Sequence, residues 1–299
     1  MTLPDGTPSH VVIAGCGYVG TALAERLAAA GFRVTGLRRS GGPTRSFEGG
    51  GSFAVRSAPL ADREALTSAC EGAEYAVFAA AADASTDEAY RQTYVDGLRA
   101  FVTALRAAHA PVRRLVFTSS TGVYGQSQGE WVDEASPTEP RGFTGQRMLE
   151  AEGVLSEAPF STVVLRLGGI YGPGRARMIA AVRRGEARLS PGAGPITNRI
   201  HRDDAAGAIA HLLSLDGAEA VYLGVDSEPA SRDDVLRFLA RSLGLPALPI
   251  DGSTASRLRG GEKRCNNARL RASGYTFVHP TYRDGYGALL AAGEGATAD

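Results

Sequence analysis

Residues 11–20 decide the fold and read Val11-Val-Ile-Ala-Gly15-Cys-Gly17-Tyr-Val-Gly20. The four apolar residues predict a buried strand, and the Ala- and Leu-rich stretch after them predicts a helix over 19–30. In the intervening G-x-G-x-x-G, Gly15 makes a tight turn, Gly17 lets the backbone approach a pyrophosphate, and Gly20 lets helix and strand pack closely. Free N–H groups at the helix start favour phosphates. The stretch therefore predicts a dinucleotide site, the alternative being a tight turn without a ligand.

The end of the second predicted strand indicates which dinucleotide binds. An acidic residue there would bind the ribose diol of NAD, but the strand ends Leu37-Arg38-Arg39-Ser40. Arginine cannot accept hydrogen bonds from ribose hydroxyls, whereas it pairs well with a 2′-phosphate. A charge-assisted bond contributes about 1.5–3 kcal/mol, enough for a marked preference. We therefore predict NADP as the cofactor and keep NAD, with a solvated arginine pair at the strand end, as the alternative.

Short apolar runs alternate with helical patterns over the first two-thirds of the chain. Strands are predicted at 11–14, 32–37, 53–55, 75–80, 114–119 and 161–167, and helices at 19–30, 88–108 and 144–155. Strands that are apolar on both faces and separated by helices predict a parallel sheet covered on both sides. The predicted fold class is α/β, a Rossmann-type doubly wound sheet with a smaller C-terminal substrate lobe.

This alternation ends near residue 170. Loop signals at 171–174 and 190–195 are followed by helices predicted at 203–215, 232–243 and 282–292 and by a strand at 221–224. We predict an NADP-binding Rossmann domain over 9–170, to which 198–224 returns, and a smaller substrate lobe made of 171–197 and 225–292. Residues 1–8 and 293–299 are expected to be loose tails.

Composition excludes several classes of protein. The 299 residues hold 32 basic and 32 acidic side chains, so the chain lacks the basic excess of a nucleic-acid or membrane-surface protein. No apolar run approaches the roughly 18 residues of a membrane span. The scattered Cys16, Cys70 and Cys265 predict no disulfides and a cytoplasmic location. Lys263 is the only lysine, an arginine bias typical of a GC-rich bacterial genome.

Three later segments carry a resemblance to a known family. Residues 115–125 read L-V-F-T-S-S-T-G-V-Y-G, residues 166–174 read R-L-G-G-I-Y-G-P-G, and residues 198–204 read N-R-I-H-R-D-D. These segments are similar to the S-x-x-V-Y-G, R-x-x-x-x-Y-G-P and I-H-V-D-D motifs of the extended short-chain dehydrogenase/reductase superfamily, of the NAD-dependent epimerase/dehydratase type. The resemblance runs over almost the full length and implies a Rossmann fold and a nicotinamide cofactor.

The catalytic residues of that family are matched only in part. There a serine or threonine holds the substrate oxygen, a tyrosine transfers the proton, and a lysine four residues later holds the ribose. Ser120 matches the serine, but the best register after Pro140 puts Phe143 at the tyrosine position and Arg147 at the lysine position. Phenylalanine has no proton to transfer and arginine stays protonated, although it can still donate to ribose hydroxyls. The chain therefore resembles an atypical member.

Candidate site residues follow from these matches. Ser120 ends a strand, where open α/β sheets bind ligands, and Tyr124 is either a substitute proton donor or a packing residue. His201 is interpreted as a structural hydrogen-bonding residue, and the histidine spacing predicts no metal site. The catalytic candidates are Ser120, Tyr124 and Arg147, and the cofactor-binding candidates are Gly15, Gly17, Tyr18, Val19, Gly20, Arg38, Arg39, Ala80, Ser119, Arg147 and Gly169.

Two functions of different classes follow. The first is an NADP-dependent oxidoreductase or epimerase/dehydratase-like enzyme for a small polar substrate, sugar derivatives included, with a non-standard proton donor. The alternative is a non-catalytic NADP(H)-binding sensor, which the missing Tyr–Lys pair favours, and a weaker third option is a lyase or isomerase with a spectator nicotinamide. We expect no nucleic-acid or membrane partner, and a homodimer through the helices at 88–108 and 144–155.

Overall fold

The computed structural model describes residues 8–48, 50–192, 194–251 and 262–295. They form two compact units, the first within 1–123, 140–166 and 206–222, and the second within 124–139, 167–205 and 223–299. The predicted tails lie largely outside the described residues. The assignment of a cofactor domain and a substrate lobe stays a prediction, because compactness does not reveal what each unit binds.

An eight-stranded sheet in the order β12-β8-β6-β5-β1-β2-β4-β3 organises the first unit. Strand β1 is wholly buried and pairs in parallel with β2 and β5, while β5 pairs in parallel with β6. Strand β3, which the sequence did not predict, lies antiparallel at the edge on β4. The predicted α/β class is confirmed. The strands are β1 (His10–Ala14), β2 (Arg33–Arg38), β3 (Thr44–Ser46), β4 (Ser52–Ser57), β5 (Tyr75–Phe78), β6 (Arg114–Ser120), β8 (Ser161–Leu167) and β12 (Val221–Gly224).

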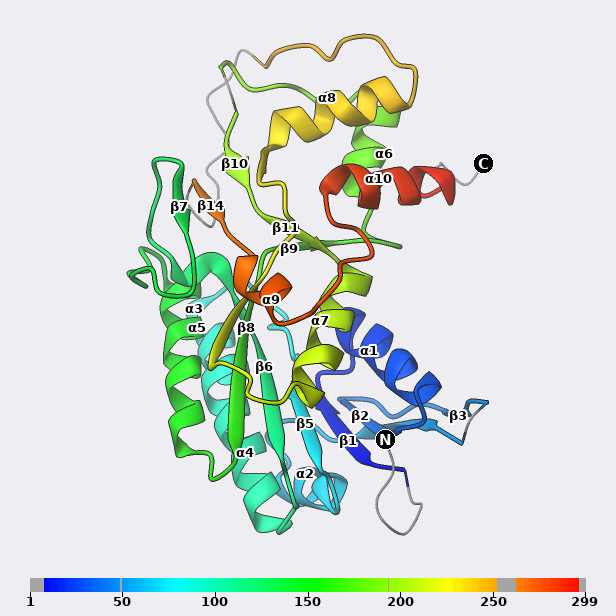
Figure 1. The fold of residues 1–299 in the computed structure, drawn as a ribbon, viewed down its shortest axis with the longest axis vertical. Coiled ribbons are helices and arrows are strands. Elements are labelled where there is room, and N and C mark those ends of the chain that lie inside the picture. Colours follow the sequence, from blue (N-terminus) through cyan, green and yellow to red (C-terminus); the bar gives the residue numbers. More distant parts are fainter. Residues whose placement is uncertain (1–7, 49, 193, 252–261, 296–299) are drawn as a thin grey trace. The chain divides into compact units, whose positions relative to one another are not determined.

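Helices cover both faces of this sheet. Helices α1 (Tyr18–Ala29) and α7 (Arg202–Ser214) lie on one face, and α2 (Arg63–Cys70), α4 (Gly97–Ala107) and α5 (Phe143–Val154) lie on the other (Figure 1). This arrangement is the doubly wound layering expected when strands are apolar on both sides. Within the described ranges, no helix combines the length and the apolar content that crossing a membrane requires.

The long helix predicted over 88–108 contains a wider turn near its start. Helix α3 (Asp87–Tyr90) begins where the side chain of Thr86 accepts a hydrogen bond from the N–H of Ala89, and α4 follows after six residues. Those six, η1 (Arg91–Asp96), form a π-helix. The predicted long helix is confirmed, because the chain is helical without a break from Asp87 to Ala107, but the apolar pattern does not reveal the wider turn inside it. Such π-turns are rare and are frequent at functional sites.

The second unit contains three small two-stranded sheets. They pair β7 with β14, β9 with β11, and β10 with β13. Strands of two or three residues are too short to produce a period, so the sequence did not predict most of them. The bounds are β7 (Glu130–Val132), β9 (Gly169–Tyr171), β10 (Ile196–Thr197), β11 (Arg199–His201), β13 (Ala230–Ser231), β14 (Lys263–Cys265), α6 (Arg177–Arg183), α8 (Arg232–Ser242), α9 (Ala268–Ala272) and α10 (Tyr282–Ala291).

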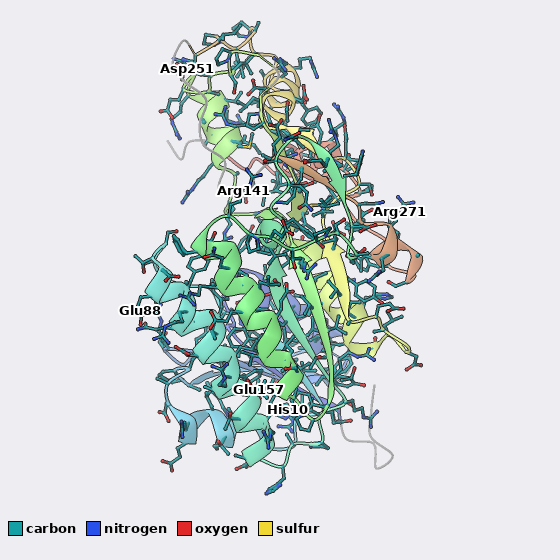
Figure 2. All side chains as sticks on the ribbon, turned by 90° about the vertical axis from the view of Figure 1, so that its left-hand side faces the viewer. His10, Glu88, Arg141, Glu157, Asp251 and Arg271 are labelled. Carbon is teal, nitrogen blue, oxygen red and sulfur yellow. The ribbon has the colours of Figure 1, made fainter. Side chains whose placement is uncertain are left out.

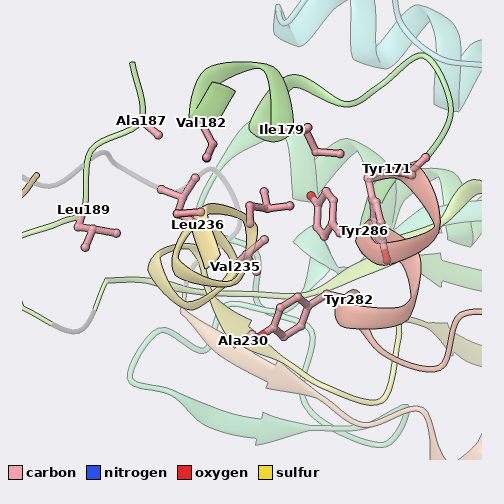
Figure 3. Packing of buried hydrophobic residues seen from close by; sticks show 13 residues of the cluster. Tyr171, Ile179, Val182, Ala187, Leu189, Ala230, Val235, Leu236, Tyr282 and Tyr286 are labelled. Carbon is pink, nitrogen blue, oxygen red and sulfur yellow. The ribbon is translucent and has the colours of Figure 1, made fainter. Parts of the chain in front are cut away.

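A buried cluster between α6, α8 and α10 forms a core of this unit (Figure 3). Tyr171 and Tyr286 stack within it with ring centroids 4.4 Å apart. A Cβ on Gly285 would lie 2.0 Å from the Tyr171 hydroxyl, so only glycine fits there. Burial raises the pKa of Tyr171. These contacts make Tyr171 a packing residue of the core.

Candidate cofactor and active site

The three glycines of the first turn have the geometry that their spacing predicts. Gly15 has φ +89°, a backbone conformation that favours glycine, and a Cβ there would lie 2.2 Å from the backbone nitrogen of Ala80. A Cβ on Gly20 would lie 2.5 Å from the Gly15 carbonyl oxygen. A Cβ on Gly17 would meet nothing within 4 Å. Gly15 and Gly20 are thus required by packing, whereas Gly17 is required only if something outside the chain approaches it.

Helix α1 begins directly at this turn. It starts at Tyr18, and no side chain caps its N-terminus at Gly17. No acidic residue stands in its first turn, so its N–H groups and positive dipole end remain suited to an anion. Val19 is buried against the sheet and is therefore a packing residue as well as a cofactor-binding candidate. The residues fit a dinucleotide, with open space at Gly17 and no competing carboxylate in the first turn.

The two arginines at the end of β2 differ in their partners. Arg39 forms a bidentate ion pair with Asp83, with N–O distances of 2.5 and 2.9 Å. The exposed guanidinium of Arg38 has no hydrogen-bond or ion-pair partner among the described residues. Burial raises the pKa of the nearby Cys16 thiol, while its Thr21 hydrogen bond and the charge of Arg38 oppose that rise. Arg38 therefore acts electrostatically on the glycine turn and has donors available for a phosphate.

A buried charge network stands behind the end of β6. Ser119 donates from Oγ to Glu152 Oε1 at 2.6 Å, and Arg166 donates from Nη2 to Glu152 Oε2 at 2.7 Å and from Nε to Oε1 at 3.0 Å. The Glu152 and Arg166 side chains are 9% and 7% exposed. The network joins β6, α5 and β8, so it fixes the strand end that carries Ser120. Glu152 was not identified from the sequence, because its role depends on Arg166 and Ser119, which lie on other elements.

Ser120 itself stands ready to donate a hydrogen bond. Its Oγ accepts a hydrogen bond from the N–H of Gly122 at 3.0 Å, within the short helix η2 (Thr121–Val123) that follows. Its hydroxyl proton meets no acceptor among the residues that the structure describes. The turn thus orients the oxygen of Ser120 and leaves its proton available.

Helix α5 presents Phe143 and Arg147 to α3. The Phe143 ring packs edge-on against Tyr90 at 5.6 Å, and Arg147 bonds Asp87 through Nε and Nη2 at 2.8 and 3.0 Å. Its Nη1 bonds Glu150, and these bonds raise the pKa of Arg147. Figure 2 shows α5 from its Arg141 end to its Glu157 end, beside the helix that carries Glu88. The carboxylates of Asp87 and Glu150 therefore bind the N–H groups of Arg147 that were predicted to donate to the ribose.

A different face of α5 packs on the end of β6. A Cβ on Gly145 would lie 2.3 Å from the carbonyl oxygen of Gly122, and Glu152, two turns along, bonds Ser119. Because the small Gly145 permits this close approach, it decides which side of the helix faces Ser120. Phe143 and Arg147 lie four residues apart on α5 and both contact α3, while their match to the family's tyrosine and lysine positions stays a prediction.

The second unit holds the remaining candidates. Tyr124 is 2% exposed, and its carbonyl oxygen accepts a hydrogen bond from Lys263 Nζ at 3.0 Å. Burial lowers the pKa of Lys263, which is 1% exposed. Gly169 opens β9, and its N–H donates to the Asn198 carbonyl at 2.9 Å. The only lysine of the chain thus serves as an anchor for the backbone at Tyr124.

Histidines approach each other in the second unit. The rings of His201 and His279 lie 4.0 Å apart, and their donor atoms come within 4.8 Å of an Asp203 carboxylate oxygen. The Asp203 N–H donates to His201 Nδ1 at 3.3 Å, and the carboxylate already pairs with Arg202. Burial and the neighbouring His279 lower the pKa of His201 to about 4. His201 thus forms the structural hydrogen bond that was predicted, and the absence of a metal site stays a prediction.

Comparisons with known proteins show what this chain is similar to. Residues 15–216 match a family model described as NAD(P)H-binding. A solved structure from Methylobacillus flagellatus, whose assignment as an NAD-dependent epimerase/dehydratase is provisional, has a TM-score of 0.76 and 42% identity, covering 95% of this chain and 98% of that one. Protein YeeZ of Escherichia coli K12 is 29% identical, covering 90% of this chain and 96% of its own. A 3-diazoavenalumate denitrifying reductase from a Streptomyces species is 29% identical, covering 93% and 99%.

Proposed function

Because this chain belongs to the NAD(P)H-binding family of epimerase-, dehydratase- and reductase-like proteins, we propose that it is an NADPH-dependent oxidoreductase. Its substrate would be a small polar carbonyl compound, sugar derivatives included. The observation that carries the proposal is Gly17, where an added Cβ would meet nothing within 4 Å, although a Cβ at Gly15 or Gly20 would lie within 2.5 Å of backbone atoms. The free guanidinium of Arg38 supports NADPH over NADH, because it offers donors to a 2′-phosphate.

The roles of the residues follow from their contacts. Gly15, Gly17 and Gly20, with the first turn of α1, would hold the pyrophosphate, and the backbone at Ala80 closes the turn from the side of β5. Bound NADPH supplies a hydride. Ser120 holds the substrate oxygen with its free hydroxyl proton, which stabilises charge that develops on that oxygen. The network of Glu152, Arg166 and Ser119 keeps the end of β6 in place.

Replacement of Ser120 tests the catalytic half of the proposal. Ser120→Ala should lower turnover about 10²-fold or more, because it removes a hydrogen-bond donor to the developing oxyanion. NADPH oxidation is followed at 340 nm over a panel of ketones, aldehydes and keto-sugars, with cofactor affinity measured by calorimetry. The affinity should stay within about threefold of the parent value. Normal turnover of a true substrate by this variant would reduce Ser120 to a structural residue.

Replacement of Arg38 tests the cofactor preference. The parent should bind NADPH about 10- to 100-fold more tightly than NADH, and Arg38→Asp should abolish or reverse that ratio, because a carboxylate repels the 2′-phosphate and accepts from a ribose diol. Calorimetric titration of both cofactors measures the ratio. Arg45→Gln is the matched control, since Arg45 is an exposed arginine paired with Glu25. Equal affinities of the parent for both cofactors contradict the preference.

A cofactor sensor without turnover is the second candidate. It is favoured by one observation: the donors of Arg147 are held by Asp87 and Glu150, and Lys263 is bound to the Tyr124 carbonyl, so neither cation is available as the family's lysine. Tight NADPH binding with no oxidation across the whole panel would favour this reading over the enzyme.

A further inference from the structure

The π-helix η1 stands at the edge of the sheet where the candidate site lies. The chain leaves β5 at Phe78 and enters α3 at Asp87, so η1 belongs to the first turns of the helix that follows this strand. In a parallel sheet such helices begin beside the carboxyl ends of the strands, where open α/β sheets bind ligands. Strand β6 lies next to β5 in register, with Phe117 opposite Phe78, and Thr118 Oγ1 donates to the Phe78 carbonyl at 3.1 Å. The loop after β5 therefore begins beside β6, the strand that ends at Ser120.

Tyr94 projects from η1 to this loop. Its hydroxyl oxygen accepts a hydrogen bond from the N–H of Ala82 at 3.5 Å, two residues past the Ala80 backbone that packs on Gly15. Leu98, four residues on, is fully buried, as expected for the side of the helix that faces the sheet. Among the described residues nothing accepts the hydroxyl proton of Tyr94. A phenol with an unused proton thus lies at the same sheet edge as Ser120.

The surroundings of Tyr94 hold the phenol in place and keep it neutral. Its ring packs on Tyr90 at a centroid distance of 5.1 Å, and Tyr90 in turn packs on Phe143. Burial is the main cause that raises the pKa of Tyr94, and the N–H of Ala82 opposes that rise. Phe143, Tyr90 and Tyr94 thus form a row of rings. Phe143, at one end, matches the tyrosine position of the family that the sequence resembles, and Tyr94, at the other end, carries a hydroxyl.

We propose that Tyr94 is the residue that donates the proton to the substrate oxygen, a role that rests on the proposed reductase function. The carbonyl carbon gains the hydride that NADPH supplies, and the carbonyl π-bond opens toward oxygen. That oxygen takes the proton of Tyr94 as the phenolic O–H bond breaks, and the products are an alcohol and NADP⁺. The phenolate regains a proton from water. Ser120, on the neighbouring strand, donates a hydrogen bond to the same oxygen.

Paired tyrosine variants test the role by turnover. Tyr94→Phe should lower NADPH oxidation about 10²- to 10⁴-fold on the best carbonyl substrate of the panel, the range typical for a general acid. The NADPH dissociation constant should stay within about threefold. Tyr90→Phe is the matched control, because it removes a hydroxyl from the same row of rings and should leave turnover within about threefold. Undiminished turnover of Tyr94→Phe overturns the proposal.

A spectroscopic readout tests the placement without any substrate. With tyrosine labelled by ¹³C at Cζ, the Tyr94 signal is identified by its loss in Tyr94→Phe, and the Tyr90 signal by its loss in Tyr90→Phe. The Tyr94 signal should shift on binding NADP⁺ and shift differently on binding NADPH, because only the oxidised ring carries a positive charge beside the phenol. The Tyr90 signal should move far less.

The outcomes separate this inference from the proposed function. A protein that reduces carbonyls while its Tyr94 signal ignores both cofactors remains a reductase, and the role of Tyr94 is overturned. A protein that binds neither cofactor overturns the proposed function and the role of Tyr94 with it. If the Tyr94 signal responds to the cofactors but the protein oxidises no NADPH, the role of Tyr94 as a proton donor is overturned. The hypothesis of a cofactor sensor is then favoured.

Discussion

Glu152→Ala is expected to cost about 3–5 kcal/mol of unfolding free energy, because it removes the buried carboxylate that pairs with the buried charge of Arg166. The carboxylate takes two hydrogen bonds from Arg166 and one from Ser119, and water has little access to replace it. Equilibrium unfolding in urea gives the loss directly. Since a typical domain has only about 5–15 kcal/mol of stability, the variant should be partly unfolded at moderate temperature.

Glu150→Ala is the matched control on the same helix. Glu150 also binds an arginine, Arg147, but its side chain is 45% exposed. An exposed pair of this kind contributes far less to stability than a buried one, because water screens its charges. If both variants lose the same unfolding free energy, burial of the Glu152–Arg166 pair does not contribute to stability.

Gly17→Val is expected to lower NADPH affinity about 100-fold or more while the protein stays folded. A Cβ at this position would meet nothing within 4 Å, in contrast to a Cβ at Gly15 or Gly20. It occupies the approach that the turn leaves for a pyrophosphate. As a poorer residue than glycine at the start of α1, valine should cost at most about 1 kcal/mol of stability. Calorimetry measures the affinity, and thermal unfolding measures the stability.

Gly153→Val supplies the comparison for that experiment. A Cβ at Gly153 also meets nothing within 4 Å, but this glycine lies near the end of α5 and away from the turn. Its NADPH affinity should equal that of the parent protein. Undiminished affinity in Gly17→Val would remove the main observation behind the proposed function.

The features that the sequence predicted well are those set by local rules. The turn at Gly15 needs positive φ and close packing, and both requirements select glycine whatever the rest of the chain does. Strands β8 and β12 begin and end at the residues predicted for them, because each holds a short apolar run, residues 163–165 and 221–223. Arg38 could be assigned to the end of β2 for the same reason.

The features that were missed depend on distant partners. The four-residue spacing correctly predicts that Phe143 and Arg147 share a face of α5. It does not predict that this face contacts α3, because the close approach of Gly145 to Gly122 turns a different face toward β6. Glu152 acquires its role only when Arg166, on another element, lies against it. The π-helix that carries Tyr94 is invisible to a periodicity argument, because its apolar spacing matches an ordinary helix on either side.

The buried Lys263 has a consequence for the covalent chemistry of this protein. Its amine is 1% exposed and bonded to the Tyr124 carbonyl, so acylating reagents and lysine-modifying enzymes find no accessible lysine side chain on the folded protein. The amine becomes reactive only when the structure around the Lys263–Tyr124 hydrogen bond opens to solvent. The rate at which Lys263 is acylated therefore reports how often this part of the second unit opens. The measurement needs no introduced label, and no second lysine obscures the signal.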